Sequence, residues 1–482
     1  MELYEIILLS LAGLLLILIG IILVRTFSFN PPKHIEVTPS TVEYDKERAL
    51  LAFSDLIKCK TVSYYDKNKE DELEFEKLFS ILPKHFPKVF EVAEKHTFKD
   101  RGLLLKIKGE SDKQPTVLMA HFDVVPVTVD KWTKNPFGAD IVDGVLYGRG
   151  AVDTKVTFSN SLFAVNTLLE QGFIPKNDMY LAYSGSEEIM GEGALEIVKY
   201  LKENNVNPAL VLDEGGAVVK DVFPGVKTPC GLIGIAEKGM IDIEYKIDSN
   251  GGHASAPKPN TPIGELSKAV CKVEDNPFPF SMTAPVKEMF NTLGRYSTFV
   301  YKMIFSNLWL FKGILNKICK KSGGDINALL RTTVAFTQSK GSEAPNVIPP
   351  TATVVSNSRI LPDSSVEYTL NRIKKTVNNP NITFTKLNSR EPSKISTTNC
   401  EGYERIKLAI EQTWQDVIVS PYLMVQCSDS RYYDLISNKV YRFSSVDLTK
   451  EERASVHGND ERIRLESFYR SVEFYLRLVK NS

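Results

Sequence analysis

Residues 177–216 read NDMYLAYSGSEEIMGEGALEIVKYLKENNVNPALVLDEGG and contain two kinds of pattern. Met179–Tyr183 and Leu210–Leu212 are short apolar runs of the kind that form buried strands. Between them, Ala194–Glu203 has the apolar spacing of a helix. A strand, a helix and a second strand in this order predict a layered α/β structure with a largely parallel sheet.

The same alternation precedes this stretch. Strand-like runs at Leu103–Ile107 and Thr116–Ala120 come before a helical pattern at Thr154–Gln171. We therefore expect an α/β domain with a mostly parallel sheet and helices on both faces. In such sheets ligands bind beyond the carboxyl ends of the strands, so residues that follow the strands are the first candidates for a site.

The pattern changes after Gly216. Leu232–Ile235 and Met240–Ile247 predict antiparallel strands, and Pro262–Lys272 and Phe299–Lys320 predict helices. Near residue 400 the helix–strand alternation resumes. The simplest topology is one α/β domain interrupted by an inserted α+β domain.

The chain has 482 residues, more than one hydrophobic core usually supports. The expected segments are a transmembrane anchor or signal segment at 1–25, a stalk at 26–44, the α/β domain at 45–231 and 395–482, and the inserted domain at 232–394. Three prolines and no helical periodicity mark the stalk.

The N-terminus carries an uncharged run, Ile6–Val24, that is long enough to cross a bilayer as one helix. No Lys or Arg precedes it, which favours a retained anchor over a cleaved signal peptide. Arg25 and Lys33 after the run favour a cytosolic C-terminal side, whereas the glycosylation sequon at Asn381 favours the opposite side. We expect a single-pass membrane or secreted protein with a lumenal or extracellular domain.

The overall composition is that of an ordinary globular protein. Hydrophobic residues make up 43% and charged residues 24%, and Lys+Arg equals Asp+Glu at 59 each. A balanced chain has no global field to attract a polyanion, so we expect no nucleic-acid partner. Six cysteines without a C-x-x-C pair argue against a zinc knuckle and against a disulfide-dense scaffold.

Six side chains of metal-binding type follow strands or glycine turns. They are His121, Asp153, Glu187, Glu188, Asp213 and His457. Two histidines and four carboxylates are what a two-metal hydrolase needs, namely ligands for both ions, a bridging ligand and a base. No H-E-x-x-H motif, G-x-S-x-G elbow or phosphate-binding loop competes with this interpretation.

Each of these residues also has an ordinary structural explanation. Asp153, at the start of a predicted helix, could be an N-cap, or it could bridge two metals about 3.5–4 Å apart. Asp123 lies two residues after His121, where its carboxylate could hold the imidazole in one tautomer. Glu187 and Glu188 diverge as neighbours do, so that one can bind metal while the other faces water.

Taken together, the motifs resemble those of the di-zinc metallopeptidase family of aminoacylases, glutamate carboxypeptidases, acetylornithine deacetylases and carboxypeptidase S. The resemblance extends from about residue 45 to the C-terminus. It is strongest to the carboxypeptidase S branch, which includes the N-fatty-acyl-amino-acid synthase/hydrolase. The matching stretches are HFDVVPV, LYGRGAVDTK, SGSEE, LDEGG, GGHAS, APNVIPP, DSRYY and VHGNDERI.

The resemblance implies two Zn²⁺ ions per subunit and a role for each residue. His121, Asp153 and Asp213 would bind one ion, and Asp153, Glu188 and His457 the other. Glu187 would be the base that deprotonates the water and protonates the leaving nitrogen. Asp123 would orient His121.

In proteins of this family the inserted domain serves as a lid and a dimerisation surface, so the resemblance implies a homodimer. His253 matches the lid histidine that stabilises the oxyanion, often across the dimer. Asn346 and Arg359 match substrate-binding positions, and a guanidinium suits a free carboxylate. The aromatic and aliphatic segment Phe299–Cys319 could receive an acyl chain or touch a membrane, although packing within a lid hairpin explains it as well.

The implied function is hydrolysis of a peptide or amide bond beside a free C-terminal carboxylate. The substrate would be a small peptide or an N-acyl amino acid. The alternatives are an N-fatty-acyl-amino-acid hydrolase/synthase and, from another class, an inactive binding or dimerisation protein. The turns around Cys427 and Ser444 depart from the branch, which puts specificity in doubt more than metal binding.

Overall fold

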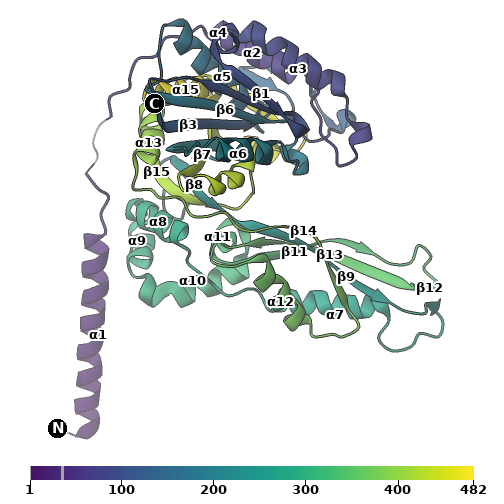
Figure 1. Ribbon diagram of the computed structural model, residues 1–482. Coiled ribbons are helices and arrows are strands. Elements are labelled where there is room, and N and C mark those ends of the chain that lie inside the picture. Colours follow the sequence, from purple (N-terminus) through teal and green to yellow (C-terminus); the bar gives the residue numbers. More distant parts are fainter. Residues whose placement is uncertain (1, 34–36) are drawn as a thin grey trace.

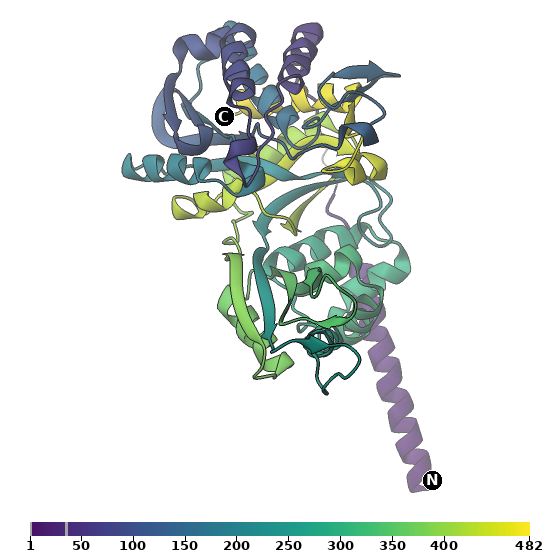
Figure 2. The same ribbon diagram turned by 90° about the vertical axis from the view of Figure 1, so that its right-hand side faces the viewer.

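A computed structural model describes residues 2–33 and 37–482 of the chain. Figure 1 shows a large α/β domain, a smaller domain beside it, and an isolated helix at the N-terminus that extends away from both. The isolated helix is α1 (Leu3–Ser28). In Figure 2 the upper end of α1 overlaps nearby helices, including α9 (Phe299–Ser306), which it contacts, and the rest of α1 extends away from the molecule.

An eight-stranded sheet forms the centre of the large domain within the described residues. Its strands are, in spatial order, β1 (Glu94–Phe98), β2 (Gly102–Ile107), β6 (Asn177–Ser184), β3 (Ser111–His121), β7 (Leu210–Val219), β16 (Val440–Leu448), β8 (Cys230–Glu237) and β15 (Ile418–Met424). The central pairs β6–β3, β3–β7 and β7–β16 are parallel, as is the outer pair β8–β15. The expected mostly parallel sheet is confirmed.

Alternating residues of the strands supply two separate cores. Leu118 and Ala120 of β3 pack into a core with α5 (Lys155–Glu170) and α15 (Leu465–Lys480). Val117 and Met119 pack on the other face, against α6 (Gly193–Glu203). Both faces of the sheet are therefore covered by helices.

Further helices surround the sheet in Figure 1. On the side of α5 the chain adds α2 (Lys46–Ile57), α3 (Glu72–His85) and α4 (Pro87–Val92). The C-terminal part contributes α13 (Glu401–Thr413) and α14 (Lys450–Ser455). A small sheet of β4 (Asp140–Val142), β5 (Val145–Tyr147) and β17 (Arg462–Arg464) joins the two halves of the domain.

The smaller domain has its own sheet and core. Its strands are, in order, β11 (Thr333–Lys340), β13 (Thr351–Ile360), β9 (Gly239–Asp248) and β14 (Thr383–Arg390). Two helices, α7 (Pro262–Asp275) and α12 (Val366–Val377), pack on it around Ile243, Tyr245 and Ile373. At the outer tip, β10 (Gly252–His253) pairs with β12 (Val347–Ile348).

Three expectations about the insertion need correction. The boundary at residue 232 falls inside β8, which pairs in parallel with β15 of the large sheet rather than antiparallel with β9. The predicted helix Phe299–Lys320 is two helices, α9 (Phe299–Ser306) and α10 (Leu308–Ser322), separated at Asn307. With α8 (Ala284–Leu293) and α11 (Gly324–Leu330), they join the core of the large domain, because α8 packs on β15.

The N-terminal helix has the length and composition expected of a membrane span. Helix α1 has 26 residues, and the tested 18-residue window within it has a mean hydropathy of 3.2, with none of that window buried. By these criteria it could be a single span or a signal sequence. Its C-terminal end, however, is packed on the fold, where Thr26 is only 1% exposed.

Candidate active site

The sheet delivers metal-binding side chains to one edge. His121 is the last residue of β3, and Glu187 and Glu188 open the short turn that follows β6. Asp153 lies two residues before α5, at the end of a loop in which Gly150 has φ +86°. His457 comes from the loop after α14. Because parallel strands end at the same edge, these distant residues meet there.

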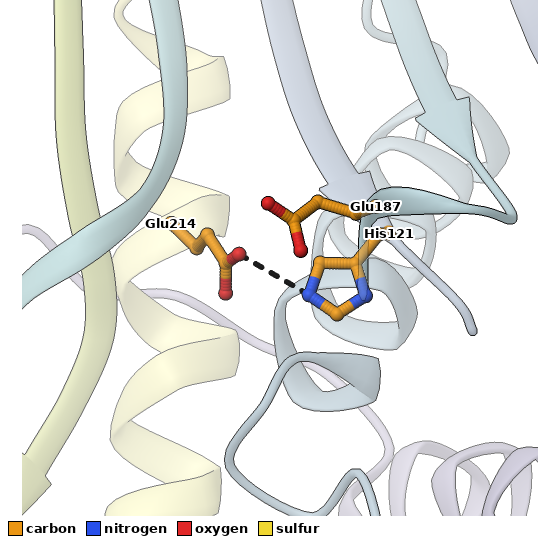
Figure 3. A group of neighbouring side chains, drawn as sticks. All are labelled: His121, Glu187 and Glu214. Carbon is orange, nitrogen blue, oxygen red and sulfur yellow. Dashed lines mark ion pairs between the residues drawn. The ribbon is translucent and has the colours of Figure 1, made fainter. Parts of the chain in front are cut away.

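One group of ligand atoms forms around His121. Its Nε2 lies 3.1 Å from Asp153 Oδ1 and 3.2 Å from Glu214 Oε1. Figure 3 shows Glu214 and Glu187 directed toward this imidazole ring. The Glu187 carboxylate lies within the same cluster, with donor atoms all within 4.8 Å of one another.

A second group forms around His457. Its Nε2 lies 3.0 Å from Asp153 Oδ2 and 3.2 Å from Glu188 Oε2. Asp153 therefore directs one carboxylate oxygen to each histidine. This is the arrangement of a carboxylate that bridges two ions.

The donor set fits divalent metal ions. Nitrogen and oxygen ligands about 2.0–2.2 Å from a tetrahedral ion lie roughly 3.3 Å apart, close to the separations found here. Glu188 Oε1 is buried and has no hydrogen-bond partner among the described residues. Hydrogen bonds to Asp153 and Glu188 raise the pKa of His457 to about 11, a sign of strong negative potential. Cations would relieve that potential.

Asp123 supports both groups from behind. Its carboxylate is fully buried and lies 3.4 Å from His121 Nδ1, whose closer contact is the Asp123 carbonyl at 3.0 Å. The same carboxylate accepts hydrogen bonds from the backbone N–H groups of Glu187 and Glu188, at 3.1 and 3.2 Å, and from Ser63. One buried anion thus fixes the imidazole and the turn that carries both glutamates.

The environment of Glu187 suits a carboxylate that gains and then loses a proton. Burial, reinforced by the carboxylates of Asp429, Glu214 and Glu188, raises its pKa well above the ordinary value, while His121 opposes the shift. Asp429 itself is buried, and its Oδ2 accepts a hydrogen bond of 2.6 Å from Ser184. Sequence reasoning missed Asp429, although it lies in the matching stretch DSRYY.

The structure favours Glu214 over Asp213 as the ligand beside His121. Asp213 Oδ2 accepts a hydrogen bond of 3.0 Å from the backbone N–H of Ser430, and it belongs to neither candidate metal group. Strand β7 does not end at Asp213 as expected but continues to Val219, with Gly215 at φ +144°. The neighbouring Glu214 faces the cluster, because successive side chains of a strand point to opposite sides.

Comparison with known proteins places this site in a family. Residues 117–481 match the model described as peptidase family M20/M25/M40. The chain belongs to this family. It is 34% identical over 431 residues to the probable carboxypeptidase S-like 2 of Dictyostelium discoideum, covering 88% of this chain and 83% of that protein. It is 33% identical over 479 residues to the N-fatty-acyl-amino acid synthase/hydrolase PM20D1 of Xenopus tropicalis, covering 97% and 93%.

Solved structures agree with the family assignment at the level of the fold. An M20 family metallo-carboxypeptidase from Sulfolobus solfataricus superposes with a TM-score of 0.67 at 17% identity, covering 90% of this chain and 98% of that one. The YXEP protein of Bacillus subtilis, a dinuclear metal binding peptidase from the M20 family, gives 0.54 at 14% identity, covering 90% and 97%. This member of the M20 family is a hydrolytic enzyme.

A buried carboxylate that sequence reasoning missed joins the two halves of the M20 site. Glu461 is fully buried; its Oε1 accepts from the backbone N–H groups of Val152 and Asp153 at 2.8 and 3.0 Å. Its Oε2 pairs with Arg149 Nη1 at 2.6 Å, and Arg149 in turn donates to the Gly458 carbonyl at 2.8 Å. The loops that carry Asp153 and His457 are thereby held together. The matching stretch VHGNDERI contains this residue and could have drawn attention to it.

Replacing Glu461 by glutamine is expected to weaken metal binding at the His457 side about 10–100-fold, the usual cost of losing a supporting residue. The amide would turn a donor toward N–H groups that need an acceptor. Metal titration would show one equivalent weakened and one retained, with Glu466→Gln, an exposed neighbour, as the control. Unchanged affinity for both equivalents would remove Glu461 from a positioning role.

The three residues that were expected to reach the site from the inserted domain, His253, Asn346 and Arg359, do not lie together. Arg359 of β13 donates from Nη1 to Cys427 Sγ at 3.4 Å and from Nε to Asn357 at 3.1 Å. Burial, together with the carboxylates of Glu237 and Glu187, raises the pKa of Cys427 to about 12.

His253 and Asn346 lie elsewhere. His253 is in β10, and the backbone N–H of Ala254 donates to the carbonyl of Asn346 at 2.9 Å. Figure 1 shows the β10–β12 tip at the far end of the smaller domain. Both side chains are exposed there, and within the described residues no hydrogen bond or ion pair links them to the metal-binding cluster.

Proposed function

We propose that this enzyme uses two zinc ions to hydrolyse a peptide or amide bond next to a free C-terminal carboxylate. The proposal rests on Asp153, because one of its carboxylate oxygens lies beside His121 and the other beside His457. His121, Asp153 and Glu214 would hold one ion, and Asp153, Glu188 and His457 the other. Glu214 here replaces Asp213 of the sequence-based ligand set.

The chain's own residues supply the proton transfers and the positioning. Two bound zinc ions would polarise the scissile carbonyl and lower the pKa of water. Glu187 takes the proton from the attacking water and later gives it to the leaving nitrogen. The Asp123 carboxylate accepts a hydrogen bond from the backbone N–H of Glu187, which keeps Glu187 in place. The same carboxylate keeps the His121 ring in one orientation.

The substrate carboxylate is assigned to Arg359. A guanidinium binds a carboxylate through two parallel hydrogen bonds, and a lysine or amide does not reproduce that geometry. Two substrate classes carry such a carboxylate beside an amide, namely small peptides and N-acyl amino acids. Similarity to the carboxypeptidase S-like protein favours the first, and similarity to PM20D1 over nearly the whole chain favours the second.

A substrate panel tests this function on the full-length protein. A blocked dipeptide and an N-oleoyl amino acid would be compared with their C-terminal amides. We expect the free acids to be cleaved and the amides to be poor substrates. Arg359→Gln is expected to raise KM for the acids by about 10²-fold, the cost of about 3 kcal/mol for one charge-assisted contact, and to leave the amides unchanged. Equal cleavage of acids and amides would contradict the proposal.

His253 and Asn346 are proposed to act in the site of a second subunit. Their exposed position on the outer tip leaves them free to enter a partner's cleft in a symmetric dimer. His253 would then donate to the developing oxyanion of the partner's substrate.

Paired variants distinguish this arrangement from one within a single chain. A purified heterodimer of Glu187→Gln and His253→Ala chains is expected to retain about half the wild-type rate, because one of two symmetric sites is complete. The matched control pairs wild type with the Glu187→Gln/His253→Ala double variant, and should be inactive. The opposite result, with activity only in the control pair, would place His253 in its own chain's site.

The N-terminal helix is proposed to be a retained anchor, with the enzyme domains on the lumenal or extracellular side. Three contacts support retention over cleavage. Arg25 donates to the Ser306 carbonyl from Nε and Nη2 at 3.1 and 2.9 Å, and Asn307 donates to the Ile22 carbonyl at 3.3 Å. Removal of α1 would take both Arg25 hydrogen bonds from the Ser306 carbonyl, and it would leave the Asn307 side chain with its bonds to Met303 and Ser306 only.

A further inference from the structure

A cavity of about 590 Å³ lies where α1 meets the enzyme. Its walls come from the end of α1, from α8 and from the junction of α9 with α10. Most of the lining is apolar. The apolar side chains are Phe29, Met282, Phe290, Phe305, Leu308 and Trp309.

Positive charge surrounds the apolar walls. Arg25, Lys287 and Arg295 line the cavity, and no carboxylate of the described residues does. Arg25 is bonded to the Ser306 carbonyl, and Arg295 to Asn291 and to the Asn30 carbonyl. Across residues 2–33 and 37–482, none of the three cations forms an ion pair. An apolar cavity with three uncompensated cations is complementary to an anion that carries a hydrocarbon chain.

The cavity also has a fixed position relative to the apolar helix. The Ile22 carbonyl, bonded to Asn307, belongs to the uncharged run of α1. Thr26 Oγ1 lies 3.3 Å from Asn307 Nδ2, and the rings of Phe27 and Phe299 are 5.8 Å apart. These contacts hold the mouth of the cavity beside the last turns of the proposed membrane span.

Helices α9 and α10 expose apolar side chains next to the cavity. Phe299, Trp309, Ile314 and Ile318 are 51–57% exposed, so packing within a lid hairpin does not explain this segment. Leu310, Ile314 and Ile318 follow one another at the four-residue spacing of one helix face, and all three are exposed. Exposed aromatic and aliphatic side chains of this kind are typical of a helix in the membrane interface.

We propose that this cavity binds an anionic membrane lipid. The headgroup would lie among Arg25, Lys287 and Arg295, and the acyl chains along the exposed apolar side chains of α9 and α10. The proposal rests on the membrane insertion of α1 and is independent of the hydrolysed substrate. The lipid would fix the orientation of the enzyme on the bilayer surface.

Trp309 provides a local probe in the full-length protein. The chain has three tryptophans; Trp132 and Trp414 are only 9% and 5% exposed, whereas Trp309 is 52% exposed and lines the cavity. Brominated acyl chains quench tryptophan emission on contact. In reconstituted vesicles we expect brominated phosphatidylglycerol, at a low fraction of total lipid, to quench several-fold more than brominated phosphatidylcholine. Trp309→Phe should abolish the quenching.

Charge-reversal variants distinguish a specific lipid-binding site from general electrostatic attraction to an anionic membrane. Lys287→Glu is expected to remove the preference for phosphatidylglycerol, and Lys320→Glu, an equal change on exposed α10 outside the cavity, should keep it. Lys287 is exposed, so the variant should fold. Equal quenching by both lipids, or an unchanged preference in Lys287→Glu, would overturn the proposal. Stronger quenching by brominated free fatty acid would also overturn it, in favour of a soluble amphiphile. Flotation of the same vesicles tests insertion of α1 separately.

Discussion

Replacing Glu187 by glutamine is expected to abolish turnover while both metal ions stay bound. The amide has nearly the same shape but cannot accept the proton of the attacking water. General base catalysis contributes about 10²–10⁴-fold, so kcat should fall by that factor. The hydrogen bond from the Glu187 backbone to Asp123 does not involve the altered group, so the turn should keep its conformation. Steady-state kinetics and metal analysis of one preparation measure both effects.

A nearby glutamate supplies the control. Glu192 follows in the same loop, is paired with Lys99 on the surface and lies outside both metal groups. Glu192→Gln should therefore behave as wild type. Wild-type kcat in Glu187→Gln would remove Glu187 as the base. Loss of a metal equivalent in that variant would instead make Glu187 a ligand, since its carboxylate lies within the His121 cluster.

Glu214 and Asp213 give the second large expected effect. Glu214→Gln removes a charged ligand atom 3.2 Å from His121 Nε2. We expect its metal affinity to fall by more than the about 10–100-fold that loss of a supporting residue costs, with activity lost in parallel. Asp213→Asn keeps an oxygen that can accept from the Ser430 backbone, so metal content should remain near that of wild type. Equilibrium dialysis with metal analysis compares the two variants.

The adjacent positions make this a sharp test. Both carboxylates are at least partly buried and differ mainly in the direction in which the strand points them. If Asp213→Asn lost the metal and Glu214→Gln kept it, the sequence-based ligand set would stand. That result would also mean that β7 turns its side chains differently when metal is bound.

The sequence could predict the edge of the sheet but not every side chain on it. His121, Glu187 and Glu188 follow apolar runs that end where the strands end, so their position came from hydrophobic pattern alone. Glu214 lies inside a strand, and choosing it over Asp213 requires the local path of the backbone at Gly215. A run of apolar residues does not reveal that path.

Long-range packing explains the other differences. Strand β8 resembles a lid strand in sequence, yet it pairs with β15, nearly two hundred residues later. Helices α8–α11 were assigned to the insertion because they lie within it in sequence, but α8 packs on β15. Glu461 is hard to find from the sequence because the four hydrogen bonds of its carboxylate reach residues about 310 positions away. No local pattern encodes these pairings.

The number of metal ions held through Asp153 is the most direct measurement. Full-length enzyme, and its Asp153→Ala variant, would be dialysed against zinc and analysed by plasma mass spectrometry. A bridging carboxylate predicts about two zinc ions per wild-type chain and loss of both high-affinity sites in the variant, because each site loses one oxygen. A wild-type chain that binds one ion or none, or a variant that keeps two, would contradict the two-metal site.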